Sequence, residues 1–272
     1  MENQVLLAQL SDTHVLEVGA ESESGVDHNA RLAEAVAALD AENPAVDAIL
    51  ATGDLVDDEQ PGQYAALSSL VAPLAAPVLA IPGNHDTRDG VRQTFPDLPW
   101  VDADHASWVV VVADRIRVVG LDSTVPGERG AEFDAGREDW LRSTLAASHD
   151  GPTVLAIHHP PFRTGIGWMD RSGFLGLERL VEVLHEHPVD RVVCGHLHRP
   201  ITSSVAGIPA QVGLSTVEHV ALDLAPGAGV ALVREPVGYQ LHHIVGRDVT
   251  THTRYIDNTE EPYRPAWAAD LE

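Results

Sequence analysis

The chain has 272 residues, 44% of them hydrophobic and 21% charged, and its formal net charge at pH 7 is -24. It contains no lysine, so all 17 permanent cations are arginine. Because so anionic a surface repels polyanions, this charge argues against binding to nucleic acid or to an anionic membrane. A small anionic substrate would need local positive charge, which bound metal ions would supply.

Length and composition predict one folded domain over residues 1–256, followed by an acidic C-terminal tail over 257–272. The single Cys194 cannot form an internal disulfide, and no basic leader with a cleavage site precedes the first apolar run. No apolar run approaches the roughly 20 residues of a membrane-spanning helix. These features predict a cytoplasmic protein.

Short apolar runs alternate with longer amphipathic runs along the first two thirds of the chain. This rhythm is typical of βαβ units around a buried sheet. We expect a strand at 5–10, a helix at 29–39, a strand at 48–52, a helix at 64–74, a strand at 78–81, a hairpin at 108–112 and 116–121, a helix at 136–147, a strand at 153–157, a helix at 173–187 and a strand at 191–194.

The helical period disappears after residue 194. Short segments separated mostly by glycine or proline follow at 201–205, 209–212, 220–224, 230–233, 239–244 and 249–254. They predict a second, mainly antiparallel sheet, in which His242, His243 and His252 occupy outward-facing polar positions. The predicted architecture is an α/β fold with two sheets packed face to face and helices outside.

Five short polar motifs each follow an expected buried strand. They are Asp12-Thr-His14, Gly53-Asp54, Gly83-Asn84-His85-Asp86, His158-His159-Pro160 and Gly195-His196-Leu-His198. The carboxyl ends of strands line the ligand crevice of α/β sheets, so we expect these motifs to converge. Residues two apart in an extended segment point the same way, which would let Asp12 and His14 hold one ion. The glycines before Asp54, Asn84 and His196 would permit close backbone approach.

The side chains of these motifs are typical metal ligands. Carboxylates, imidazoles and one amide oxygen, with no thiolate cage, suit Mn, Fe, Zn or Co better than Ca or Mg. The seven candidates are too many for one tetrahedral ion, which favours two ions roughly 4 Å apart with a shared carboxylate. The candidate ligands are Asp12, His14, Asp54, Asn84, His158, His196 and His198.

The order DxH, GD, GNHD, HHP and GHLH between Gln9 and His198 resembles that of the calcineurin-like metallophosphoesterases. Within them the chain is similar to class III cyclic-nucleotide phosphodiesterases, and His158 to Asp170 also resembles bacterial glycerophosphodiesterases. The resemblance implies a four-layer αββα sandwich that binds two metal ions, with Fe or Mn expected and Zn or Co as alternatives. A homodimer is compatible with it, because many relatives are dimers.

Position by position, the resemblance implies two ligand sets that share Asp54. Asp12, His14, Asp54 and His198 would hold one ion, and Asp54, Asn84, His158 and His196 would hold the other. A hydroxide bridging the ions would attack phosphorus in line. His85 would contact the phosphate and stabilise or protonate the leaving oxygen. His159 is expected to pack outside the ligand set, and Asp86 to cap the following helix.

The substrate that these features predict is a phosphodiester. A 3′,5′-cyclic nucleotide such as cAMP, hydrolysed to a 5′-nucleotide, is the leading interpretation. A glycerophosphodiester or a range of small diesters is the alternative, and a non-catalytic, metal-stabilised binding module is the alternative from another class. The sequence leaves open whether 17–27 or 161–172 forms a substrate lid and whether Trp168, Met169 and Asp170 line the substrate mouth. Arg163 is interpreted as a solvated surface residue, with contact to the second ester arm as the alternative.

Overall fold

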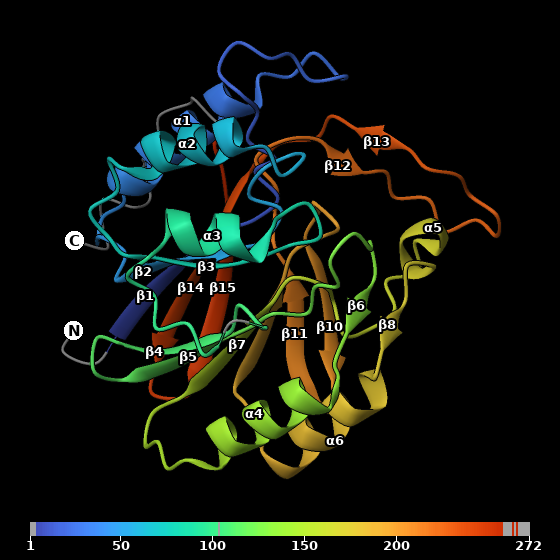
Figure 1. Cartoon of the computed structure of the whole chain (residues 1–272). Coiled ribbons are helices and arrows are strands. Elements are labelled where there is room, and N and C mark those ends of the chain that lie inside the picture. The colour runs from blue at the N-terminus through green and yellow to red at the C-terminus, as the bar shows by residue number, and fades with distance from the viewer. Residues whose placement is uncertain (1–3, 103, 258–262, 264, 266–272) are drawn as a thin grey trace.

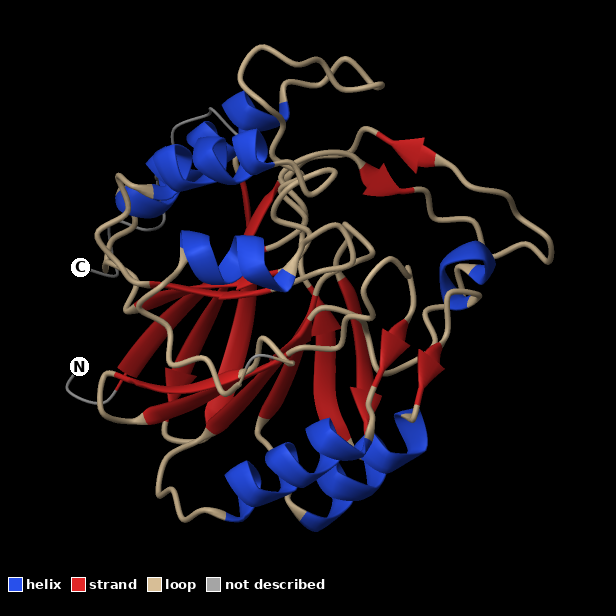
Figure 2. Cartoon of the chain, in the orientation of Figure 1, coloured by secondary structure: helices blue, strands red, loops and turns tan. Residues whose placement is uncertain are grey.

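The structure is a computed structural model that describes residues 4–102, 104–257, 263 and 265. Two mixed β-sheets pack face to face, and helices cover both outer faces (Figures 1 and 2). The predicted αββα fold class is therefore confirmed. Of the predicted acidic tail 257–272, all but residues 257, 263 and 265 lie outside the described residues. None of the helices in the described part is long and apolar enough to cross a membrane.

The first sheet has the strand order β15-β14-β1-β2-β3. Its strands are β1 (Gln4–Leu10), β2 (Ala48–Thr52), β3 (Val78–Ile81), β14 (Gly238–Val245) and β15 (Asp248–Tyr255). β1, β2 and β3 run parallel, whereas β14 and β15 join them as an antiparallel hairpin. The helices on this side are α1 (His28–Asp40), α2 (Pro61–Val71) and α3 (Arg88–Thr94).

The second sheet has the order β10-β11-β9-β7-β5-β4. Its strands are β4 (Trp108–Val112), β5 (Ile116–Leu121), β7 (Thr153–Ile157), β9 (Arg191–Cys194), β10 (Ile201–Val205) and β11 (Ile208–Val212), and α4 (Ala135–Ala146) and α6 (Leu177–Glu186) cover it. The shorter elements are β6 (Ala131–Glu132), α5 (Gly167–Asp170), β8 (Phe174–Leu175), β12 (His219–Val220) and β13 (Leu232–Val233).

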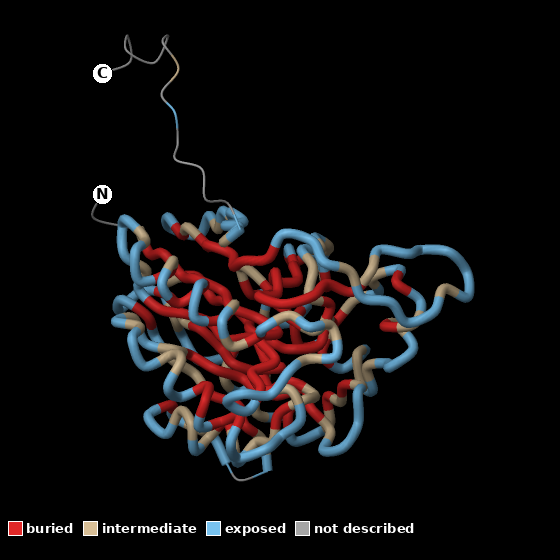
Figure 3. Tube along the Cα trace, turned by 90° about the horizontal axis from the view of Figure 1, so that it is seen from above, coloured by how far each residue is buried: buried red, intermediate tan, exposed pale blue. Residues whose placement is uncertain are grey.

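The core lies between the sheets and continues under the helices on each side (Figure 3). β2 and β7 are buried along their whole length, as expected for central parallel strands covered on both faces. Trp108 on β4 is fully buried, and its indole N–H donates to the carbonyl of Ala80 on β3 at 2.6 Å. This hydrogen bond joins the two sheets, so the large side chain packs without leaving a buried donor unpaired.

The prediction of a separate antiparallel sheet in the C-terminal third is wrong. The β10–β11 hairpin extends the second sheet through β9, and the β14–β15 hairpin extends the first through β1. Alternating apolar residues indicate a strand but not its neighbour, which long-range pairing decides. The strands expected at 220–224 and 230–233 shrink to the two-residue β12 and β13. The helix expected at 173–187 begins only at Leu177, because residues 174–175 form β8.

His242 contradicts the outward-facing interpretation of the late histidines. Its side chain is buried between the sheets, where Nε2–H donates to Oε1 of Gln9 and Nδ1 lies 3.0 Å from the hydroxyl of Thr251. His252 is exposed and His243 is half-buried. β14 lies between β1 and β15, so its residues face the other sheet on one side and the helical layer on the other.

The buried His242 predicts a specific loss of stability in acid. Burial lowers its pKa to about 3, so the native state keeps the ring neutral, whereas in the unfolded chain the ring takes up a proton below the ordinary histidine pKa of 6.5. Because the unfolded state binds more protons, the free energy of unfolding falls as the pH drops from 6.5 toward 3. We expect His242→Gln to lose less stability than the wild type over this window in urea unfolding at several pH values. Equal slopes of unfolding free energy against pH in the two proteins would contradict the neutral, buried state of His242.

Candidate metal centre and active site

The five polar motifs meet at one edge of the two sheets. Three follow the neighbouring parallel strands β1, β2 and β3, and two follow β7 and β9 in the facing sheet. Because the carboxyl ends of these parallel strands lie together, distant residues come into contact. His14 Nε2, for example, lies 3.1 Å from His198 Nε2 although the residues are 184 positions apart.

Four of the expected ligands form one compact group. Asp12, His14, Asp54 and His198 offer nitrogen and oxygen atoms that all lie within 4.8 Å of one another. Asp12 Oδ1 is 3.7 Å from His198 Nε2, and Asp54 Oδ2 is 3.8 Å from His14 Nε2. The structure thus brings together the four residues that the sequence assigns to the first ion.

The second group also includes Asp54. His158 Nε2 lies 3.4 Å from Asp54 Oδ2 and 3.3 Å from Asn84 Oδ1. The ring centroids of His158 and His196 are 5.1 Å apart. The four residues expected around the second ion therefore gather at one place, and Asp54 stands between the two groups.

His159 lies beside the second group, with its ring 4.7 Å from that of His196. Both of its nitrogens have partners, since Nδ1 is 2.8 Å from the Ser123 hydroxyl and Nε2–H donates to the Arg129 carbonyl. Burial lowers the pKa of His159 to about 3, which keeps the ring neutral. One nitrogen of His159 also lies within 4.8 Å of nitrogens of His158 and His196, so the position of His159 outside the ligand set stays a prediction.

Most of the candidate ligands have an unusual backbone conformation. Nine non-glycine residues in the described part of the chain have positive φ, and five of them are the candidate ligands Asp12, His14, Asp54, His196 and His198. Residues other than glycine rarely adopt this region, and such strain concentrates at functional sites. The expected extended Asp12-Thr-His14 segment is therefore wrong, because both residues are left-handed, with φ of 52° and 42°.

Glycine is required where two motifs pass each other. Gly53 has φ of 86°, and a Cβ atom added to it would lie 2.5 Å from His158 Nδ1 and 2.7 Å from the Gly83 nitrogen. No side chain fits there without moving the motifs that follow β3 and β7. The expected close backbone approach before Asp54 is confirmed.

The hydrogen bonds of the first group show that it suits a cation. His14 Nδ1–H donates to Asp57 at 3.2 Å, and His198 Nδ1–H donates to the Glu218 carbonyl at 2.6 Å. These bonds place each proton on Nδ1, so two unprotonated Nε2 atoms face each other. Burial lowers the pKa of both histidines, that of His198 to about 4. A cation bound between these two nitrogens would accept both lone pairs. In metal sites, a hydrogen bond from the other ring nitrogen fixes the tautomer and orientation of a histidine ligand in the same way.

In the second group, a proton on His158 balances the negative charge of the carboxylates, as a bound cation would. Burial raises the pKa of Asp54, but the His158 charge and its hydrogen bond outweigh burial and hold that pKa well below its usual range. Burial lowers the pKa of His158, whereas Asp54 and Asp12 bring it to about 9. His158 Nδ1–H donates to the Thr52 carbonyl, so the compensating proton sits on Nε2, where a metal ion would displace it.

His85 lies on the His14 side of the centre. Its ring is 4.7 Å from that of His14, its backbone N–H donates to Asp54, and its Nδ1–H donates to the Asp57 carbonyl at 2.6 Å. Its Nε2 is the ring nitrogen left for a substrate. Asp57 was not among the expected site residues, although it orients His14 through its carboxylate and His85 through its carbonyl. Its signal in the sequence is the second carboxylate of Gly53-Asp-Leu-Val-Asp57.

Asp86 does not cap α3, so that expectation is wrong. Thr87 is the N-cap, and its hydroxyl accepts from the Gly90 N–H. The Asp86 carboxylate turns inward and accepts backbone N–H groups, including those of Leu55 and Gly83. It therefore ties the motif after β2 to the motif after β3, and burial raises its pKa to about 7.

His28 and Glu218 contact residues of the first group from outside it, and neither was expected at the site from the sequence. His28 Nδ1–H donates to the His14 carbonyl at 2.8 Å, and its Nε2 lies 3.3 Å from the Glu218 carboxylate. The Glu218 carbonyl in turn accepts from His198. No motif marks these positions, because 190 residues separate them and only the folded chain brings them together.

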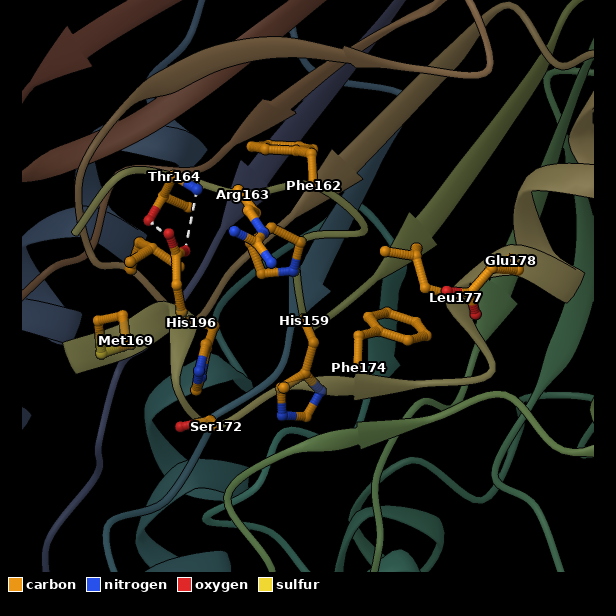
Figure 4. A pocket seen from close by; sticks show the side chains of 14 residues that line it. His159, Phe162, Arg163, Thr164, Met169, Ser172, Phe174, Leu177, Glu178 and His196 are labelled. Carbon is orange, nitrogen blue, oxygen red and sulfur yellow. Dashed lines mark hydrogen bonds between the residues drawn. The ribbon is translucent and has the colours of Figure 1, made fainter. Parts of the chain in front are cut away.

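A cavity of about 270 Å³ opens beside His159 and His196 (Figure 4). Segment 160–178 supplies most of its wall, so the candidate lid segment 161–172 borders it. Arg163 lines the cavity and is otherwise exposed, whereas Trp168 packs partly buried against the core.

Known proteins share both the sequence and the fold of this chain. Residues 5–200 match the calcineurin-like phosphoesterases. A protein of Arcobacter nitrofigilis named probable glycerophosphodiester phosphodiesterase is 32% identical over 95% of this chain and 96% of its own length. A protein of Rhodococcus erythropolis named probable cyclic nucleotide phosphodiesterase is 39% identical over 77% of this chain and 70% of its own length.

Among solved structures, a purple acid phosphatase from yellow lupin, Lupinus luteus, superposes with a TM-score of 0.66. The match covers 96% of this chain and 53% of the lupin chain at 14% identity, so it supports the fold alone. The motif order, the sandwich and the sequence matches agree: this chain belongs to the calcineurin-like phosphoesterase family.

Proposed function

We propose that this protein hydrolyses 3′,5′-cyclic nucleotides, with cAMP as the leading substrate, to 5′-nucleotides. The observation that carries the proposal is the arrangement around Asp54, where imidazole nitrogens of His14, His158 and His198 gather with carboxylate and amide oxygens at the edge of the sheets. The cyclic-nucleotide name of the Rhodococcus relative supports the substrate class.

We further propose that the two groups hold two metal ions, with Asp54 as the shared ligand. Asp12, His14 and His198 complete the first set, and Asn84, His158 and His196 complete the second. Fe or Mn is the expected metal, and Zn or Co would suit the same ligands. When bound, the ions would neutralise the phosphate oxygens and lower the pKa of a coordinated water.

The protein's own residues determine where the proton goes. In the reaction, a bond from phosphorus to the attacking oxygen forms and the bond to O3′ breaks, so O3′ needs a proton. The Nδ1–H of His85 donates to Asp57, which leaves Nε2 to supply it. Burial lowers the pKa of His85, but Asp54 and Asp57 more than offset burial and raise it, which favours the protonated form that a general acid needs.

A glycerophosphodiester is the second candidate substrate. A second cavity, of about 320 Å³, borders Gly83 and Asn84, whereas the first borders His159 and His196. An acyclic diester has two arms that could use both cavities, while a cyclic nucleotide has a single nucleoside. The nearly full-length match to the Arcobacter relative supports this alternative.

Steady-state hydrolysis by the Mn-loaded protein tests the proposal. We expect turnover of cAMP above that of glycerophosphocholine, with bis(p-nitrophenyl) phosphate as a reference diester. Preference for glycerophosphocholine would select the second candidate, and turnover of the reference diester alone would reject both natural substrates. No turnover of any diester would favour a metal-stabilised binding module instead. Cytoplasmic location and a homodimer stay predictions.

Asp57→Asn should weaken metal binding, because the carboxylate that accepts from His14 is lost. Residues that orient a histidine ligand are typically worth about 10–100-fold in metal affinity, so we expect a loss in this range. The matched control is Asp58→Asn, which removes the same charge from the exposed neighbouring residue. Calorimetric Mn²⁺ titration of both variants checks the prediction, and equal affinities would rule out this role for Asp57.

A further inference from the structure

The cavity beside His159 and His196 lies at one end of the candidate metal centre. His85 packs against His14, whereas His159 and His196 pack against His158. If His85 protonates the leaving oxygen, the leaving arm lies on the His14 side. The other ester arm, which stays on phosphorus, then extends toward His196 and into this cavity.

The walls of the cavity combine apolar and polar side chains and carry both signs of charge. Phe162, Met169 and Phe174 line it, and the two phenylalanines are partly buried against the core (Figure 4). Arg163 is the single permanent cation among the lining residues, which also include the carboxylates Asp170 and Glu178. Such a lining does not compensate a second phosphate, so it disfavours a second anionic group on the arm.

Asp170, one of the two lining carboxylates, accepts hydrogen bonds that hold the loop at residues 164–170. Asp170 accepts the backbone N–H and hydroxyl of Thr164 at 2.9 and 2.8 Å, and also the backbone N–H of Gly165 (Figure 4, dashed lines for Thr164). These bonds fix residues 164–170 as a compact turn and keep this carboxylate from pairing with a ligand. The wall is thus ordered before a ligand binds, which reduces the conformational entropy lost on binding.

The combination of aromatic faces with one arginine suits a nucleobase. Phenylalanine rings stack on flat bases, and the planar guanidinium of Arg163 can donate to the oxygen and nitrogen acceptors on a base edge. The volume of about 270 Å³ lies just below the range of roughly 300–1,000 Å³ that holds drug-sized ligands, so one arm is the appropriate occupant.

We propose that the cavity lined by Phe162, Arg163 and Phe174 binds the ester arm retained on phosphorus and selects nucleoside arms over small ones. This inference rests on the proposed phosphodiesterase function and adds the residues that choose the substrate. Phe174 is the principal specificity residue, and Arg163 contacts the base edge.

Three substrates with the same leaving group isolate the retained arm. They are the p-nitrophenyl esters of methyl phosphate, thymidine 5′-phosphate and phosphocholine, each followed by p-nitrophenolate release from the Mn-loaded protein. Base stacking on an aromatic side chain is worth about 1–3 kcal/mol. We therefore expect Phe174→Ala to lower the thymidine-to-methyl ratio of kcat/KM about tenfold, equivalent to about 1.4 kcal/mol, and to change the choline-to-methyl ratio less than about twofold.

Two further variants separate stacking from folding. Phe174→Leu keeps apolar volume and should show an intermediate loss of the thymidine preference. Leu175→Ala removes the neighbouring side chain, which is 68% exposed and is not among the lining residues, and should keep the wild-type ratio. Thermal unfolding of each variant checks that the metal-loaded proteins remain folded.

The results distinguish the pocket from the function. A larger fall for the choline ester than for the thymidine ester would overturn the nucleoside assignment. Equal falls for all three esters would show that the cavity does not hold the retained arm. Failure of the wild type to release p-nitrophenolate from any ester would instead reject the phosphodiesterase function itself, and the pocket assignment with it.

Discussion

Asp54→Asn should abolish hydrolysis and release metal from both positions. The Asp54 carboxylate lies within reach of His14 in one group and of His158 in the other, so a neutral amide weakens both at once. Removal of a single electrostatic stabiliser typically costs about 10²–10³ in kcat, and in the proposed centre Asp54 serves two ions, so we expect a loss of roughly 10⁴-fold or more. Metal analysis after gel filtration and steady-state kinetics with bis(p-nitrophenyl) phosphate measure the two effects.

Asp12→Asn is the matched comparison, because Asp12 belongs to the first group alone. It should retain the ion of the second group, whereas Asp54→Asn should retain neither. Two full equivalents of metal in Asp54→Asn would show that Asp54 is not the shared ligand.

His85→Ala should lose activity while it keeps its metals. The ring lies beside the centre, where one of its nitrogens is within 4.8 Å of ligand atoms of His14 and Asp57, and its Nδ1–H donates to the Asp57 carbonyl. In the proposed mechanism its Nε2 serves the leaving oxygen and not a metal ion. General acid catalysis contributes about 10²–10⁴-fold, so we expect kcat for cAMP to fall within this range. Kinetics and metal analysis of the same preparation provide the measurement.

The leaving group tests the proton-transfer role of His85. p-Nitrophenolate is a stable anion and leaves with little help, whereas the O3′ alkoxide of cAMP needs a proton. The loss in His85→Ala should therefore be much larger for cAMP than for bis(p-nitrophenyl) phosphate. Equal losses would indicate that His85 binds the phosphate without protonating the leaving oxygen, and unchanged rates would remove it from the site.

Much of the candidate centre could be predicted because its residues follow buried strands. The apolar runs before Asp12, Asp54, Asn84, His158 and His196 identify parallel strands, and the carboxyl ends of such strands meet. Residue types at these ends then indicate metal chemistry. The backbone of the Asp12 motif could not be predicted in the same way, because left-handed conformations outside glycine arise where the surrounding structure imposes them.

The supporting residues depend on contacts that no local pattern records. Glu218 orients His198 through a carbonyl group, which every residue possesses, so its side chain gives no signal. The β14–β15 hairpin pairs with β1 across more than two hundred residues, and His242 is buried only because of that pairing. Local periodicity identifies such strands as strands, while their partners follow from the packing of the whole chain.

The candidate ligands are distributed over two sheets, which has a consequence for folding. Asp12, His14, Asp54 and Asn84 follow strands of one sheet, and His158, His196 and His198 follow strands of the other. Ions held at this edge would act as reversible cross-links between the two halves of the sandwich, because the unfolded chain does not present the ligands together. Free metal at a hundred times its dissociation constant would add about 2.7 kcal/mol to the unfolding free energy. Ions that activate a substrate would thereby also favour unfolding of the two sheets together in one cooperative step.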